Sequence, residues 1–391
     1  MDKATKKTLT WMGAAKWTGV TLAVIALGII LNHYWIKNVV EKSELEALRQ
    51  SFSVRLDEVE GLIENDLYDD ALSKMEELEK DLPKSNFPLL YAQLKSNFAI
   101  YYLEEKSGIR IEEALKKAVY NLGEALEVFT LVSNPIKYAM NKHNLGIAYT
   151  DLAEVRNREE NLALAVSAYM EALIIRTINR YPIDYAMTQN NLGNVFSSLS
   201  EVHNTEEYLG VSVSACKEAL KIRTIERHPL DYAATQNNLA NAYSNLAKVR
   251  DAEENLDLAV RACKEALKIV KIERHPIKYA LTQNNLGIAY RRLSEVRNTE
   301  DNLRLAVSAF MEALKIYSFK RHPIKHAMTQ NNLGAAYIGL ADVRNRKENL
   351  DLAVSAYMVA LKIYTKEMLP NRIKLVTKNL EIARAKLREL Q

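Results

Sequence analysis

Seven of the eight prolines in this 391-residue chain are separated by a constant interval of 47 residues. They are Pro88, Pro135, Pro182, Pro229, Pro276, Pro323 and Pro370. The residues between them repeat as well: TQNNL begins at Thr188, Thr235, Thr282 and Thr329, and EAL begins at Glu124, Glu171, Glu218, Glu265 and Glu312. A fixed period of this length indicates an array of repeats, in which each unit mainly contacts its two neighbours.

Each repeat contains the signals for two helices. Proline can open the first, which we call helix A, because its missing N–H is surplus in the first turn of a helix. After Pro276, apolar residues follow at spacings of three or four, as on one helical face. These residues are Leu286, Ala289, Tyr290, Leu293 and Val296.

A second helix, helix B, is predicted from a start signal that recurs in every repeat from Pro135 onward. The signal is a capping residue followed three positions later by an acid, and both side chains can bond free N–H groups at a helix start. The pairs are Asn157/Glu160, Asn204/Glu207, Asp251/Glu254, Asn298/Asp301 and Asn345/Glu348. One helix pair cannot bury both its faces, so we expect neighbouring pairs to stack into an all-α solenoid.

The spacing of key residues resembles the tetratricopeptide repeat, whose pattern is W-x2-L-G-x2-Y, then A-x3-F, then P. Here Leu286-Gly287-x2-Tyr290 is followed by Ala306-x3-Phe310 and Pro323. Matching elements stand at Leu145/Gly146/Tyr149, Leu192/Gly193/Phe196, Leu239/Ala240/Tyr243 and Leu333/Gly334/Tyr337. Gln189, Gln236, Gln283 and Gln330 replace the Trp, and each repeat is longer by about thirteen residues. The long repeats are most similar to those of kinesin light chains and of bacterial and archaeal arrays, and imply a right-handed superhelical solenoid.

Upstream of the repeats, the sequence predicts a transmembrane helix at residues 17–36. These twenty residues carry no charge, and twenty residues of helix rise about 30 Å, the thickness of a bilayer core. The three tryptophans, Trp11, Trp17 and Trp35, lie at or just beyond its ends. A cleaved secretory signal is the alternative, but the apolar stretch is long and no small-residue cleavage site follows it.

The segments on either side of this span differ in charge. The basic tail at 1–16 contains four lysines, whereas the acidic helical segment at 37–87 contains seven basic and fourteen acidic residues. The small excess of lysine before the span favours a cytoplasmic amino terminus and an extracytoplasmic repeat domain in the cell membrane. A helix-bend-helix around Asp69, Ala71 and Leu78 could be a degenerate first repeat; six repeats follow at 88–369, and a capping helix at 370–391.

The resemblance implies that helix A lines a concave groove for a peptide or protein partner. It assigns two positions per repeat to that groove, and a third lies one turn further on. The predicted contacts are Asn190, Asn194, Ser197, Asn237, Asn241, Ser244, Asn284, Arg291 and Asn331, with His143, Ile147, Ile288 and Ala335 at the same positions of other repeats. The alternative is that the asparagines bond neighbouring helices. We favour this reading for Asn191, Asn238, Asn285 and Asn332, and leave both open for the first asparagine of each pair.

Other functions have weaker support in the sequence. No nucleophile elbow, P-loop, zinc pattern or dinucleotide fingerprint is present, so we expect no enzyme activity, no metal site, no cofactor and no small-molecule substrate. Cys216 and Cys263 are interpreted as core residues, and His228, His275 and His322 as helix-start residues. A basic stripe on helix B could bind RNA or an anionic surface, and self-association is a further possibility. The stripe comprises Lys221, Arg223, Arg227, Lys268, Lys271, Arg274, Lys315, Lys320 and Arg321.

Overall fold

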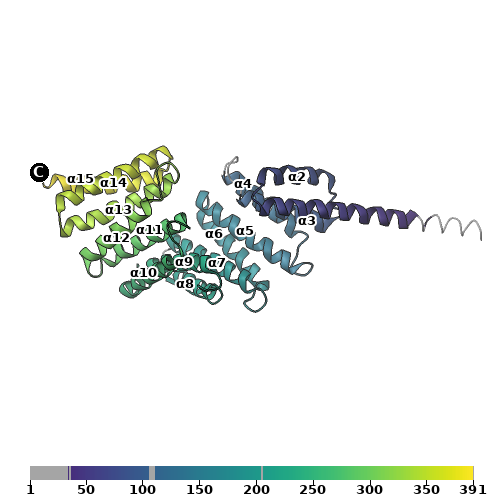
Figure 1. Cartoon of the computed structure of the whole chain (residues 1–391), viewed down its shortest axis with the longest axis horizontal. Coiled ribbons are helices and arrows are strands. Elements are labelled where there is room, and N and C mark those ends of the chain that lie inside the picture. Colours follow the sequence, from purple (N-terminus) through teal and green to yellow (C-terminus); the bar gives the residue numbers. More distant parts are fainter. Residues whose placement is uncertain (1–33, 35–36, 105–110, 204–205, 391) are drawn as a thin grey trace, which may run out of the picture. The chain divides into compact units, whose positions relative to one another are not determined.

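The computed structural model describes residue 34 and residues 37–104, 111–203 and 206–390. Within these ranges the chain contains helices and turns and no strand, which confirms the predicted all-α fold there (Figure 1). The predicted span at 17–36 lies outside the described residues, apart from Tyr34. Among the helices that are described, none combines the length and the hydropathy needed to cross a bilayer.

The described chain forms two compact units. The first contains a helix over residues 37–64, α2 (Tyr68–Asp81) and α3 (Pro88–Glu104). Its core joins Phe52, Leu56 and Val59 to the buried face of α2 and to aromatic residues of α3. The predicted bend is present between residue 64 and α2, whereas residues 37–50 of the first helix are exposed along their whole length.

The second unit is a solenoid of helix pairs. Every helix A begins at a repeat proline, as predicted, and consecutive pairs stack along the chain from α5 to α15 (Figure 1). Helix α4 (Ile111–Leu126) is divided between the two units at Gly123. The remaining helices are α5 (Pro135–Val155), α6 (Arg158–Ile175), α7 (Pro182–His203), α8 (Glu206–Leu220), α9 (Pro229–Leu246), α10 (Ala252–Ile269), α11 (Pro276–Leu293), α12 (Thr299–Leu314), α13 (Pro323–Val343), α14 (Arg346–Lys366) and α15 (Pro370–Arg388).

Helix B starts where predicted, but the predicted capping bond is wrong. In α6, α10, α12 and α14 the capping residue is left-handed, with φ of 45–46°, and its side chain makes no capping hydrogen bond. Asn and Asp tolerate this conformation better than most residues, which accounts for their choice here. A later asparagine stabilises the bend instead: Asn161 Nδ2 donates to the Arg156 carbonyl at 2.9 Å, and Asn255, Asn302 and Asn349 repeat this bond.

Close contact between helices A and B depends on glycine. A Cβ built on Gly287 would lie 2.6 Å from the Phe310 ring, and Gly146 and Gly334 have the same relation to Tyr169 and Tyr357. We number the six repeats from the one that begins at Pro88, so repeat 4 begins at Pro229. Repeat 4 has an alanine, Ala240, in place of the glycine and a smaller side chain, Cys263, in place of the aromatic ring. Both cysteines are fully buried and unpaired, so the prediction that they are core residues is confirmed.

This contact predicts a coupled pair of substitutions. Gly287→Ala should destabilise the solenoid by about 1–3 kcal/mol, because the added methyl group overlaps the Phe310 ring. Combining it with Phe310→Cys, which recreates the Ala/Cys pair of repeat 4, should cost less than the sum of the two single changes. Urea unfolding of the four proteins measures this coupling, and strictly additive costs would contradict the contact.

Candidate partner-binding surface

The first asparagine of each pair lies between neighbouring helices A. Asn190, Asn237 and Asn284 are only 8%, 4% and 9% exposed, and Asn331 is half-buried. Their amides bond the following repeat: Asn238 Nδ2 donates to Asn190 Oδ1 at 3.0 Å, and Asn237 Nδ2 donates to Thr282 Oγ1 at 2.8 Å. Similar bonds join Thr329 and Asn332 to Asn284, and Asn379 to Asn331. Of the two readings left open for the first asparagine, these bonds favour the one in which its amide joins neighbouring repeats.

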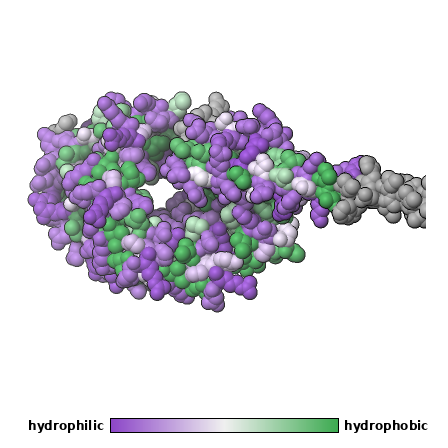
Figure 2. All heavy atoms as spheres, turned by 45° about the vertical axis from the view of Figure 1, so that its right-hand side comes forward, coloured by the Kyte–Doolittle hydropathy of each residue, from purple (hydrophilic) through white to green (hydrophobic). Residues whose placement is uncertain are grey.

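The second asparagine bonds a neighbouring helix A in several repeats, which confirms the favoured interpretation for Asn238 and Asn332: each donates to the first asparagine of the preceding repeat. Asn144, Asn191, Asn238, Asn285, Asn332 and Asn379 occupy this position, and all are half-buried. Three residues further along the same helical face, Asn194 and Asn241 are exposed. We call Asn191, Asn194, Asn238 and Asn241 the amide surface; it spans α7 and α9. On the face of the molecule drawn in Figure 2, hydrophilic side chains surround smaller groups of hydrophobic ones.

The serines predicted one turn beyond lie beneath this surface. Ser197 and Ser244 are 2% and 4% exposed, so neither is available to a partner in this arrangement. The Ser197 hydroxyl accepts from Asn241 Nδ2 at 3.3 Å and from Asn245 Nδ2 at 3.4 Å. These two bonds position α9 against α7. Arg291, the last predicted contact, is partly exposed and pairs with Glu295 at 2.8 Å.

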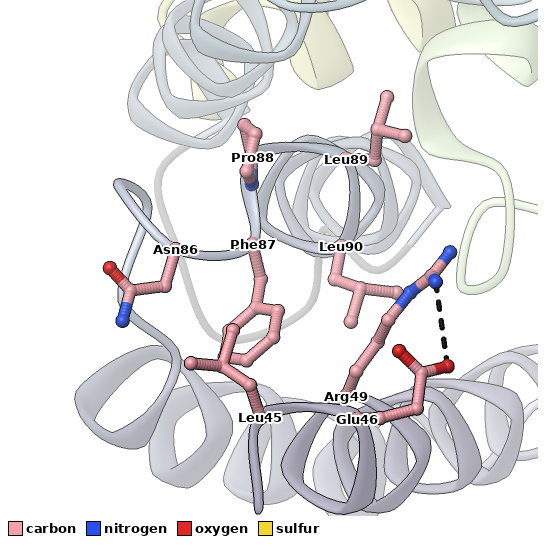
Figure 3. Close-up of a pocket in the computed structure, with 8 residues that line it drawn as sticks. All are labelled: Leu45, Glu46, Arg49, Asn86, Phe87, Pro88, Leu89 and Leu90. Carbon is pink, nitrogen blue, oxygen red and sulfur yellow. Dashed lines mark ion pairs between the residues drawn. The ribbon is translucent and has the colours of Figure 1, made fainter. Parts of the chain in front are cut away.

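Each of the two units contains a hollow. One, of about 310 Å³, lies where α9, α10 and α11 meet, and its lining includes Lys248, Arg291 and Arg292. The other, of about 280 Å³, lies in the first unit between the helix over 37–64 and the start of α3 (Figure 3). Its lining is Leu45, Glu46, Arg49, Asn86, Phe87, Pro88, Leu89 and Leu90, and includes none of the predicted site residues.

Comparison with known proteins identifies the repeat. A family model described as tetratricopeptide repeat matches residues 233–277. The matched segment covers most of one 47-residue period, and the other periods share its proline, leucine and asparagine positions. This period of the chain therefore matches the tetratricopeptide repeat.

Two solved structures resemble the chain in its helical arrangement. The apo form of RapI is 14% identical, with a TM-score of 0.45, and the match covers 86% of this chain and 98% of RapI. A Rap protein complexed with competence and sporulation factor is 15% identical, with a TM-score of 0.40, covering 88% of this chain and all of that one. The similarity is too low to transfer a ligand from either protein. No curated protein sequence matches.

Four of the nine cations in the basic stripe on helix B are paired or buried within the repeats. Lys221 lies 2.6 Å from Glu218, three residues earlier, and Lys268 and Lys315 pair with Glu265 and Glu312 in the same way. Arg223 is only 7% exposed; it donates to Thr235 Oγ1 at 3.1 Å and lies 3.9 Å from Asp231. Paired and buried cations contribute little attraction for a polyanion, so these four residues weaken the stripe as a candidate site.

A row of ion pairs between repeats was not predicted from the sequence. An arginine at the end of helix A pairs with a glutamate at the start of the preceding helix B, at 2.6–2.7 Å. The pairs are Arg156/Glu112, Arg250/Glu206, Arg297/Glu253 and Arg344/Glu300. His203 replaces the arginine in repeat 3 and lies 3.0 Å from Glu159. The recurrence of the Arg and Glu every 47 residues is a signal for these pairs.

His143 occupies the first-asparagine position in repeat 2 and is 1% exposed. Its Nδ1 lies 3.0 Å from Thr188 Oγ1, which donates to the Asp184 carbonyl and accepts from Arg176. His143 Nδ1 must therefore carry the hydrogen, which leaves Nε2 buried without a partner. Burial, followed by the charges of Arg176 and Arg223, lowers the pKa of His143 to about 3, so the imidazole is neutral in the folded protein.

This predicts a pH-dependent stability that one substitution removes. As pH falls below about 6.5, unfolded His143 takes up a proton that the folded protein excludes, so the free energy of unfolding falls by up to about 1.4 kcal/mol per pH unit. His143→Asn, the residue of repeats 3 to 6, should lose this contribution. Urea unfolding of both proteins at about pH 7 and about pH 5 gives the comparison. Equal pH dependence in the two proteins would show that His143 protonates freely in the fold.

Proposed function

We propose that this protein is a noncatalytic interaction scaffold that binds an extended peptide, or an extended segment of a protein, along the amide surface. The observation that carries the proposal is the recurrence of open amides at equivalent positions of α7 and α9. Each amide offers both a donor and an acceptor, so it can pair with a backbone N–H and C=O of the partner whatever the partner's side chains are. The right-handed winding implied by the family would place this face on the inner, concave side of the solenoid.

The nine predicted site residues take two roles in this proposal. Asn194, Asn241 and Arg291 contact the partner, because they are exposed or partly exposed on the open face of helix A. The buried or half-buried members position the helices that carry the contacts. These are Asn190, Ser197, Asn237, Ser244, Asn284 and Asn331.

Hydrogen bonds from the amide surface alone give weak binding. Four such bonds at a net 0.5–1.5 kcal/mol each contribute about 2–6 kcal/mol, which corresponds at best to a Kd of tens of micromolar. A biologically useful affinity therefore needs further contacts along the same face. It also follows that small changes in the amide surface have measurable effects on binding.

The test removes the two exposed amides of the amide surface, at the loss of one bond between repeats, from Asn241 to Ser197. Asn194→Ala/Asn241→Ala introduces the residue that repeat 6 carries at this position, Ala335. The partner is recovered with the full chain in a crosslinking pull-down from native membranes and quantified by mass spectrometry. Without the hydrogen bonds from the Asn194 and Asn241 amides, partner recovery should fall about fivefold or more. Undiminished recovery of every partner would reject the amide surface as the binding site.

Two controls separate binding from folding. Ser167→Ala/Ser214→Ala removes exposed polar groups from helix B, away from the amide surface, and should leave recovery unchanged. Asn284→Ala leaves Asn332 Nδ2 without its acceptor in repeat 5 and should lower the free energy of unfolding by about 1–3 kcal/mol. The double variant at Asn194 and Asn241 loses the bond from Asn241 to Ser197, so its free energy of unfolding should fall by only about 0.5–1.5 kcal/mol, which leaves the repeats folded.

We also propose that residues 17–36 anchor the scaffold in the cell membrane, with the repeats on the extracytoplasmic side. The uncharged twenty-residue stretch, the flanking tryptophans and the lysines of the basic tail support this. Deleting residues 1–36 should release the chain from the membrane fraction, and protease added to intact cells should digest the repeats of the full chain. Retention of the truncated chain in washed membranes would contradict the anchor, and protected repeats would reverse the orientation.

A further inference from the structure

The repeats can be compared with one another, and the hollow beside α11 departs from their shared charge pattern. It lies at the junction of repeats 4 and 5, with Lys248 on α9's side and Arg291 and Arg292 on α11. Elsewhere the position of Lys248 is acidic: it holds Glu154, Glu201, Glu295 and Asp342 in repeats 2, 3, 5 and 6. The two arginines replace Ser197/Ser198 of repeat 3, Ser244/Asn245 of repeat 4 and Ile338/Gly339 of repeat 6.

This departure from the repeat pattern leaves an excess of positive charge. The hollow is lined by three cations and one carboxylate, Glu295, which pairs with Arg291 at 2.8 Å. Arg292 Nη1 donates to the Ser244 carbonyl, a neutral partner. Among the residues that the structure describes, no carboxylate lies within ion-pairing distance of Lys248, and the nearby Glu201 is 2.8 Å from Arg158.

Burial and the accumulated positive charge lower the pKa of two of these cations. Burial and the charge of Arg292 lower the pKa of Lys248, and burial and the charge of Arg291 lower the pKa of Arg292. The start of α10, at Ala252, also lines the hollow, and a helix start adds partial positive charge. An anion placed here would relieve this repulsion.

We propose that the hollow formed by Lys248, Arg291 and Arg292 binds a carboxylate of the partner segment, on the assumption that the proposed function holds. Asn241 is exposed in the last two turns of α9, and Lys248 lies in the turn that follows that helix, seven residues further along, so one extended partner can span both. The group can be an Asp or Glu side chain or a free carboxyl terminus, since all three present the same two oxygens.

The open face beyond the hollow specifies the rest of the partner. In α11, α13 and α15, apolar side chains are exposed at two kinds of position. One is equivalent to the amide surface of α7 and α9, and the other lies one helical turn before it. The side chains are Leu281, Met328, Leu375 and Ile382, exposed by 36–47%. One end of the partner segment extends from the carboxylate toward α15. We therefore expect that end to carry apolar side chains.

The test uses defined peptides. A phage-displayed library of random peptides is selected against the full chain in detergent, and selected peptides are synthesised with each carboxylate in turn converted to its carboxamide. For the wild-type chain, fluorescence anisotropy should show affinity falling about tenfold or more when one carboxylate is neutralised. Amidating only the carboxyl terminus, or only one Asp or Glu, identifies which source supplies the group.

Two matched variants locate the carboxylate. Lys248→Glu introduces the residue of repeats 2, 3 and 5, and Lys278→Asp introduces that of repeats 3 and 4, so each makes the same charge change with a residue the fold already accommodates. Lys248→Glu should bind the acid and the amide peptides equally, whereas Lys278→Asp should keep the wild-type difference. Equal binding of both peptides by the wild-type chain, or an unchanged difference in Lys248→Glu, would overturn the carboxylate site.

Failure of this inference can be distinguished from failure of the proposed function. If selected peptides lose affinity in Asn194→Ala/Asn241→Ala but are indifferent to their carboxylates, the amide surface stands and the carboxylate site falls. A library that yields no peptide dependent on Asn194 and Asn241 contradicts the proposed function, and the carboxylate site with it.

Discussion

Polar groups that become buried between successive helices A must find partners in the next repeat, and this constraint organises the solenoid. An unpaired buried amide costs about 1–3 kcal/mol, which is large against the marginal stability of a protein. The bonds from Asn238 to Asn190 and from Asn237 to Thr282 meet this requirement at successive junctions. Because the junctions engage amides of both rows, the turn beyond them, with the exposed Asn194 and Asn241, remains for contact with other molecules.

The junctions vary in a coordinated way, which shows that each is a local solution to the same constraint. Arg176 and Arg223 are buried beside Asp184 and Asp231 at two junctions. At the next two, the arginine is replaced by Val270 and Tyr317, and the aspartate by Lys278 and Lys325. The buried charge and its counter-charge change together, as expected when a buried cation is tolerated only with a nearby anion.

A second coordinated change occurs within the repeats. A tyrosine near the start of helix A donates to a glutamate of helix B in repeats 1 to 5, as in Tyr185/Glu218 at 3.1 Å and Tyr279/Glu312 at 3.1 Å. In repeat 6 both partners differ: His326 bonds the Tyr317 carbonyl, and Val359 stands at the glutamate position. Where a repeat departs from the pattern without such a compensating change, as Lys248 does, the departure is a candidate for function rather than packing.

The sequence by itself determined the period, the two helices of each repeat, the proline at each helix A start and the burial of Cys216 and Cys263. These follow from local rules: proline geometry, apolar spacing and the need of a helix pair to bury its flanks. Only the tertiary structure decided which asparagine of each pair stays open. Adjacent residues on a helix point about 100° apart, and whether Asn190 or Asn191 meets the next repeat depends on how neighbouring helices are rotated. The same rotation buried Ser197 and Ser244 and brought Lys248 beside Arg292, a contact between residues of different repeats that no local pattern specifies.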